Sequence, residues 1–161
     1  LTKTIDNSRL ISTNDGWEFS CISDIYGFHQ YFADPEKFAK QYEDFDAISK
    51  LGMFNRPLET IKPLDNKPVI ISEFGGIALN NKDSDAWGYN SDAKDEKDYK
   101  DKIEKQINSI LSLDYLCGYC YTQLTDVMQE VNGLLKIDRT PKLPIKEYTK
   151  IFSKNSIKYQ R

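Results

Sequence analysis

The residues best suited to chemistry follow a short apolar run near the middle of the chain. In KPVIISEFGG (67–76), the run 69–71 leads to Glu73 and then to the paired glycines Gly75 and Gly76. A carboxylate fixed at the end of a strand can serve as a nucleophile or an acid. Glycines just beyond it let the backbone approach a ligand or adopt positive φ. The same pattern also suits a carboxylate that only caps a loop, so both interpretations stay open.

Other candidate residues lie in segments that follow strand-like runs. His29 is the one histidine, and beside Tyr26 and Tyr31 it suits either a buried structural role or a hydrogen bond to a ligand. Trp87 and Tyr89 suit either stacking on a sugar ring or pinning of their loop. The remaining polar candidates fix loops as readily as they contact a substrate; they are Asn14, Asp15, Glu18, Asp126 and Glu130.

The cysteines offer a weak signal for redox or metal chemistry. Cys117 and Cys120 form a C-x-x-C, but the surrounding CGYCYTQL is strand-like, and positions i and i+3 of a strand point to opposite faces. A zinc site needs a second pair of ligands, and only Cys21 and His29 remain. We therefore expect structural cysteines in the core, and neither a metal nor another cofactor.

The hydrophobic pattern predicts an α/β chain. Runs rich in β-branched and aromatic residues predict strands at 9–13, 24–29, 68–74 and 118–124. Helical spacing predicts a helix that opens at Asp34-Pro35-Glu36 and carries Phe38, Tyr42, Phe45 and Ile48. It also predicts a second helix over 96–113 and a third after Pro144, with apolar positions Ile145, Tyr148 and Ile151.

This alternation of strands and helices is typical of a parallel sheet built from βα units. The long segments that follow the strands should then all lie at the carboxyl edge of the sheet, where α/β proteins build their sites. These segments are 14–20, 30–36, 75–94 and 125–142.

Composition limits the classes of partner. The chain has 161 residues and a formal net charge of −3, which argues against a nucleic-acid footprint. It contains no apolar run near the roughly 20 residues that a membrane-spanning helix needs, so we expect no membrane partner. Its first ten residues lack the apolar stretch of a secretory signal and do not begin with methionine. Localisation therefore stays open between cytoplasmic and secreted.

Four phrases in a fixed order resemble one enzyme family. They are STNDGWE (12–18), DIYGFHQY (24–31), VIISEFGG (69–76) and GYCYTQLTDVMQEVNGLLKIDRTPK (118–142). Together they resemble the C-terminal half of the catalytic barrel of glycoside hydrolase family 2, which holds β-galactosidases, β-glucuronidases and β-mannosidases. The resemblance implies one unit over 1–161, formed by strands five to eight of a TIM (β/α)8 barrel. A whole barrel takes about 250 residues, so the upstream half and the family's β-sandwich domains are expected to be absent.

The resemblance also implies a mechanism and a site. It makes Glu73, at the end of strand seven, the nucleophile of a retaining glycosidase, which works with a second carboxyl group as acid/base. In this family the acid/base is the Glu of an Asn-Glu pair, and no such pair occurs in the chain. The chain alone is therefore expected to be nearly inactive. With Trp87 as a stacking candidate, the implied substrate-binding residues are Asn14, Asp15, Tyr26, His29, Tyr121, Gln123 and Asp126.

The expected partners follow from the same resemblance. They are a carbohydrate substrate, the missing N-terminal half of the enzyme, and a second copy that pairs through exposed barrel edges as a homodimer. The competing interpretation is a non-enzymatic carbohydrate-binding or structural module derived from a glycosidase, in which Glu73 would be dispensable. Another family of retaining barrels with a glutamate at the end of strand seven is a further alternative.

Overall fold

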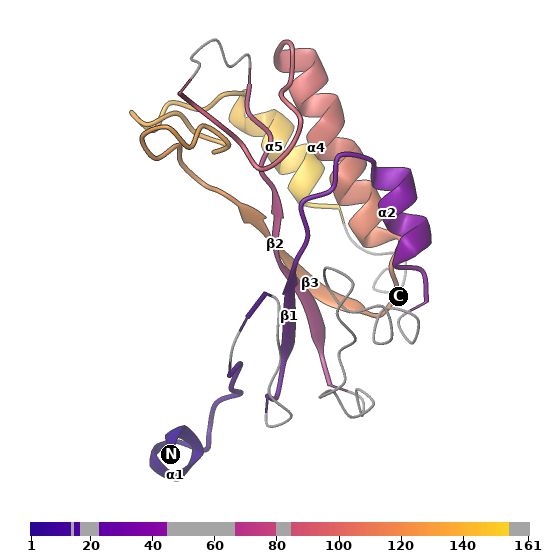
Figure 1. Cartoon of the computed structure of the whole chain (residues 1–161), viewed down its shortest axis with the longest axis vertical. Helices are drawn as coiled ribbons and strands as arrows, with labels where there is room; N and C mark the ends of the chain where they lie inside the picture. Colours follow the sequence, from indigo (N-terminus) through magenta and orange to yellow (C-terminus); the bar gives the residue numbers. More distant parts are fainter. Residues whose placement is uncertain (14, 17–22, 45–66, 80–84, 155–161) are drawn as a thin grey trace.

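A computed structural model describes residues 1–13, 15–16, 23–44, 67–79 and 85–154. In these residues three strands alternate with helices, which confirms the predicted α/β class. The elements, in chain order, are α1 (Thr2–Ile5), β1 (Tyr26–His29), α2 (Pro35–Gln41), β2 (Val69–Gly75), α4 (Glu96–Leu111), β3 (Leu116–Thr122) and α5 (Ile145–Phe152) (Figure 1).

The described strands form a parallel sheet in the order β1-β2-β3. His29 at the end of β1 pairs with Glu73, and Gly75 at the end of β2 pairs with Thr122 of β3. Because the strands are parallel, their carboxyl ends meet at one edge. The segments that follow them therefore begin at the same edge, as the sequence predicts.

The prediction of a strand at 9–13 is wrong. In this segment the N–H of Ile11 donates to a carboxylate oxygen of Asp24 at 3.0 Å, and the N–H of Thr13 donates to Ser23 Oγ at 3.3 Å. These backbone N–H groups therefore bond polar side chains instead of the carbonyl groups of a neighbouring strand.

This N-terminal segment contacts the sheet a few residues further along the chain, at Gly16. Gly16 forms an isolated parallel bridge to Phe28 of β1, and its N–H donates to the carbonyl of Gly27 at 3.2 Å. The described sheet therefore has three strands and one such contact at its β1 edge, an arrangement compatible with part of a barrel.

The three helices predicted from the sequence are present. Asp34 caps α2 by accepting hydrogen bonds from the N–H groups of Glu36 and Lys37 at 3.1 and 3.0 Å. The expected positions Phe45 and Ile48 lie outside the described residues. The second and third predicted helices appear as α4 and α5.

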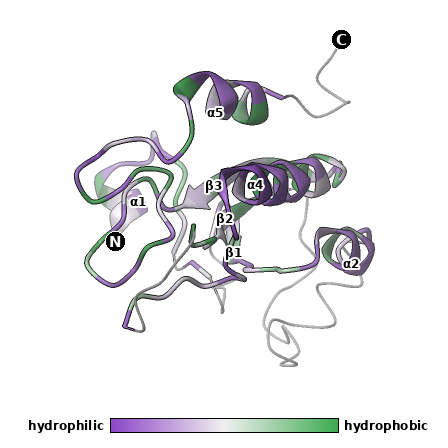
Figure 2. Ribbon diagram, turned by 90° about the horizontal axis from the view of Figure 1, so that it is seen from above, coloured by the Kyte–Doolittle hydropathy of each residue, from purple (hydrophilic) through white to green (hydrophobic). Residues whose placement is uncertain are grey.

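Helices α2, α4 and α5 gather on one side of the sheet (Figures 1 and 2). α4 packs against both α2 and α5. The core lies between this helical layer and the sheet, and its fully buried side chains include Ile71, Phe74, Tyr99, Ile103, Ile107, Ile110 and Ile151. Ile145, an expected apolar position at the start of α5, is exposed instead.

The cysteines depart from the expected core positions. Cys117 and Cys120 lie in β3, and their thiols are free and exposed. Cys120 alternates with Tyr119 and Tyr121, which pack toward Phe152 of α5, so its side chain lies on the face of the sheet away from the helices. Cys21 lies outside the described residues. Within the described ranges, no helix is long and apolar enough to span a membrane.

Candidate active site

Glu73 marks the point where β2 changes from core packing to a polar edge. The next residue, Phe74, is fully buried, whereas the side chain of Glu73 is 39% exposed. Gly75 and Gly76 then take φ of +105° and +67°, values that L side chains rarely adopt. A Cβ at Gly75 would strike the ring of Tyr121. The two glycines therefore turn the chain sharply just beyond the carboxylate, in agreement with their predicted use.

His29 joins Glu73 to a second carboxylate. Its Nδ1 lies 3.1 Å from Oε2 of Glu73, and its Nε2 lies 3.5 Å from Oδ2 of Asp15. The histidine side chain is only 16% exposed. Two residues expected to bind substrate are thus linked to the candidate nucleophile, His29 by direct contact and Asp15 through His29.

Tyr31 is a further partner of Glu73 that the sequence analysis did not select. Its hydroxyl donates to Oε2 of Glu73 at 2.7 Å. Burial raises the pKa of Tyr31, and the negative charge of Glu73 raises it further, so the hydroxyl keeps the proton that it donates. Tyr31 stands two residues after His29, and this i, i+2 spacing was the available signal.

An aromatic group continues from Tyr31 toward solvent. The rings of Tyr31 and Tyr89 stack with centroids 4.4 Å apart, and Trp87 meets Tyr89 edge-on at 5.0 Å. Trp87 and Tyr89 are about half exposed. The backbone of Trp87 is bonded to the segment after β3, donating to the carbonyl of Gln129 and accepting from the N–H of Val131. Trp87 therefore belongs to the same edge as Glu73, with a face available to a ligand.

The other expected site residues make contacts elsewhere. Tyr26 is buried in β1 under Lys67, whose Nζ lies 5.4 Å from its ring. Tyr121 packs edge-to-face on Phe74, and its ring also meets Phe152 of α5. These two tyrosines contribute to packing rather than to the group of side chains around Glu73.

The two candidates from the last long segment also have other partners. Asp126 is buried and accepts hydrogen bonds from the N–H of Gly133 at 2.7 Å and from Nζ of Lys142 at 2.8 Å. Gln123 donates to the carbonyl of Glu130 at 3.5 Å. The contacts of Asp126 favour the loop-fixing role that the sequence left open. Asn14 lies outside the described residues.

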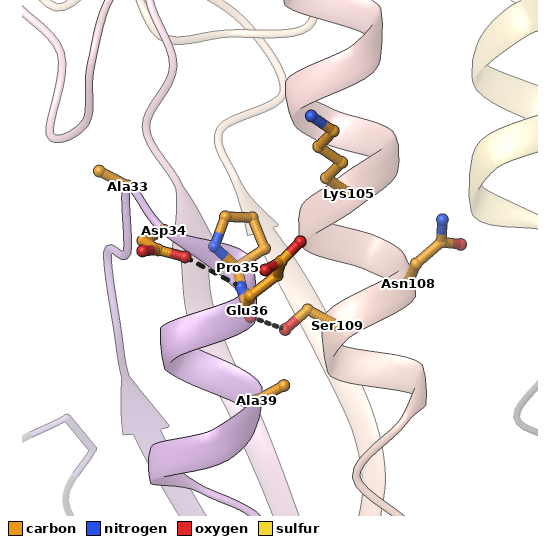
Figure 3. Close-up of a pocket in the computed structure, with 8 residues that line it drawn as sticks. All are labelled: Ala33, Asp34, Pro35, Glu36, Ala39, Lys105, Asn108 and Ser109. Atoms are coloured by element: carbon orange, nitrogen blue, oxygen red, sulfur yellow. Dashed lines mark hydrogen bonds between the residues drawn. The ribbon is translucent and has the colours of Figure 1, made fainter.

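A separate groove lies between α2 and α4 (Figure 3). Its lining residues are Ala33, Asp34, Pro35, Glu36, Ala39, Lys105, Asn108 and Ser109. Two of its polar side chains already have structural partners, since Asp34 caps α2 and Ser109 Oγ donates to the carbonyl of Pro35 at 2.6 Å. The groove shares no residue with the Glu73 group. Over the described ranges, no cluster of three or more His, Cys, Asp or Glu side chains is arranged to hold a metal ion.

Comparison with solved structures shows what the fold is like. No protein-family model and no curated protein matches the sequence. A β-D-glucuronidase from Dictyoglomus thermophilum aligns with 95% of the chain at a TM-score of 0.61 and 19% identity. A β-glucuronidase from an uncultured Clostridium sp. aligns with 94% at 0.62 and 16% identity, and an exo-β-agarase aligns with 92% at 0.57 and 14% identity.

The alignments cover only part of each neighbour. The chain spans 27% and 28% of the two glucuronidase chains and 19% of the agarase chain. At these identities the likeness shows a shared fold. The chain therefore has the fold of a portion of known glycoside hydrolases.

Proposed function

We propose that the chain is part of a retaining β-glycosidase in which Glu73 is the nucleophile. The observation that carries this proposal is the arrangement of the two oxygens of Glu73. Oε2 is held by the hydroxyl of Tyr31 and by Nδ1 of His29, while Oε1 has no hydrogen-bond partner among the described residues. A carboxylate held through one oxygen and open at the other is suited to attack a carbon centre.

The chemistry would follow the double-displacement route. Oε1 of Glu73 would form a bond to the anomeric carbon as the bond from that carbon to the leaving oxygen breaks, giving a covalent glycosyl–enzyme. Water would then cleave this ester and release the sugar with retained configuration. Protonation of the leaving oxygen and activation of water require a second carboxyl group, which the resemblance to glycoside hydrolase family 2 assigns to an Asn-Glu pair that this sequence lacks.

The fold supports a position in the C-terminal half of a (β/α)8 barrel. Parallel βα units, the site at the carboxyl edge and the likeness to glycosidase chains all agree with that position. The residue named for sugar contact is Trp87, whose exposed ring lies at this edge. Terminal β-linked sugars are the proposed substrates.

Covalent labelling with 2,4-dinitrophenyl 2-deoxy-2-fluoro-β-glycosides tests the nucleophile. Dinitrophenolate leaves without a proton donor, so this reagent probes Glu73 even where the acid/base residue is absent. We expect intact mass spectrometry to show one added sugar per chain, located by peptide mapping at Glu73. The galactoside, glucuronide and mannoside should be compared, because the sugar that labels fastest indicates specificity.

Two variants make the labelling result decisive. Glu73→Gln should abolish labelling, whereas Glu36→Gln, at an exposed site on α2, should label as the unchanged chain does. A folded chain that no sugar labels would overturn the nucleophile assignment. If the unlabelled chain and its Glu73→Gln variant bound sugars equally well, a carbohydrate-binding module would replace the glycosidase as the proposed function.

We also propose that the face of the sheet opposite the helices, with the edges at β1 and β3, meets the complementary half of a barrel. Parallel strands are normally covered on both faces, and unpaired edges associate readily. Alone, the chain should therefore form dimers or bind a dye for exposed apolar surface. A monomer by size-exclusion chromatography with light scattering, without dye binding, would contradict this.

A further inference from the structure

We propose that Asp15 is a positioning residue, which acts through His29 to fix the carboxylate of Glu73. The inference rests on the proposed role of Glu73 as nucleophile and deepens it. Asp15 and His29 were expected to bind the sugar, but the distances give them a different task. The ring of His29 lies between two carboxylates, 3.1 Å from that of Glu73 and 3.5 Å from that of Asp15.

Asp15 is itself anchored, which a positioning residue must be. Its Oδ1 accepts hydrogen bonds from Ser72 Oγ at 2.7 Å and from the N–H of Gly16 at 3.1 Å. Its other oxygen, Oδ2, is the one that faces Nε2 of His29. Because Ser72 precedes Glu73 in β2, the strand that carries the nucleophile also carries an anchor for the group that orients it.

Two glycines make room for this arrangement. A Cβ at Gly27 would strike Oδ1 of Asp15 and Oγ of Ser72. A Cβ at Gly16 would lie 2.9 Å from the ring of His29, and Gly16 also has a φ of +97°. A larger residue at Gly27 would displace Asp15 or Ser72, and one at Gly16 would displace His29. The absence of a side chain at these two positions therefore leaves space for the contact between Asp15 and His29.

The chemistry of the contacts explains why Asp15 matters to Glu73. Each ring nitrogen of His29 faces a carboxylate oxygen, and the two carboxylates therefore constrain the ring from both sides. Asp15 thereby holds the ring in the rotation that places Nδ1 3.1 Å from Oε2 of Glu73. The Asp of a Ser-His-Asp triad orients its histidine in the same manner. Without Asp15, the ring can turn about its Cβ–Cγ bond and release the nucleophile.

Nitrogen NMR of the imidazole ring tests this orientation without any sugar. His29 is the only histidine in the chain, so its ring signals need no assignment among others. At one fixed pH, Asp15→Asn and Glu73→Gln should each move the ring ¹⁵N–¹H signals. Asp6→Asn is the matched control, because Asp6 lies in the same N-terminal segment and its carboxylate accepts hydrogen bonds from Ser8 instead of facing His29. It should leave the ring signals in place.

Labelling kinetics supply the functional readout. With the dinitrophenyl 2-deoxy-2-fluoro glycoside that labels fastest, Asp15→Asn should lower the saturated labelling rate about 10²-fold, the cost of a misplaced reacting group. The reagent concentration at half-saturation should change far less, since a positioning residue acts on the chemical step. Asp15→Glu, which keeps a carboxylate, should recover part of the rate. A change confined to the half-saturation concentration would make Asp15 a sugar-binding residue and overturn the inference.

The two readouts separate this inference from the proposed function. Ring signals that do not move in Asp15→Asn overturn the inference whether or not the chain is labelled. If no reagent labels the chain but the ring signals move in both variants, the contact between Asp15 and His29 is supported and the assignment of Glu73 as nucleophile is overturned. Amide spectra of Asp15→Asn that match the unchanged chain away from the site exclude unfolding as the cause.

Discussion

Glu73 and Asp126 are both carboxylates near the carboxyl edge of the sheet, yet their surroundings are opposite. The side chain of Glu73 is 39% exposed, and its described side-chain partners are a tyrosine and a histidine. The side chain of Asp126 is 10% exposed and pairs with Lys142, which is 5% exposed. Position along the sheet edge therefore does not decide the role of an acid. The difference lies in whether a buried cation already neutralises it.

The buried pair has a structural task that reaches the site indirectly. Nζ of Lys142 also donates to the carbonyl of Val131 at 2.7 Å, and the N–H of Val131 donates to the carbonyl of Trp87. Lys142 and Asp126 thereby hold the segment after β3 against the segment that carries Trp87. One region supplies the reactive group, and the other supplies the frame for an aromatic wall.

The largest expected effect on stability comes from removing the buried cation. Lys142→Met should lower the free energy of unfolding by about 3 to 5 kcal/mol, because Asp126 is left as a buried charge without its partner. Urea denaturation followed by circular dichroism measures this, and exposed Lys136→Met is the control. A loss below about 1 kcal/mol, typical of exposed ion pairs, would show that the two regions do not differ as described.

High pH should act on the buried region with a smaller effect. Burial raises the pKa of Tyr148 to about 12, and it raises those of Tyr99 and Tyr121 as well. In the unfolded chain these hydroxyls ionise near pH 10. Their contribution to stability is therefore complete below about pH 10 and is lost as the pH rises through the folded-state values. Burial lowers the pKa of Lys142, which works in the opposite direction.

Urea unfolding at a series of pH values between 8 and 11.5 measures this loss. In Tyr148→Phe the fall in stability above pH 10 should be shallower, because one buried hydroxyl no longer titrates. A stability that stays level over this range would contradict the described burial of the tyrosines.

What could be predicted from the sequence was local. The cap at Asp34 and the strand that carries Glu73 depend on residues a few positions apart, and both were identified. The strand predicted at 9–13 failed because its backbone donors at Ile11 and Thr13 bond Asp24 and Ser23, which lie thirteen and ten residues away. Propensity alone carries no signal of such competition.

The candidate site divides in the same way. The types of residue around Glu73 could be predicted, but their assignment to partners could not. His29 and Tyr31 reach Glu73 across more than forty residues of chain, and only the parallel pairing of β1 with β2 brings them together. The cluster around Asp126 was ambiguous for a similar reason, since its cation comes from Lys142 at the end of a long segment.

The smallest expected change in stability, with a clear change in chemistry, comes from Tyr31→Phe. The ring still stacks on Tyr89, so the free energy of unfolding should change by no more than about 1 kcal/mol. The lost hydrogen bond to an ionised group should slow labelling of Glu73 about tenfold or more. Tyr119→Phe, which removes a hydroxyl on the helical side, should label at the unchanged rate. If Tyr31→Phe also labelled at that rate, the Tyr31 hydroxyl would not be holding the nucleophile, and His29 alone would remain to position Oε2.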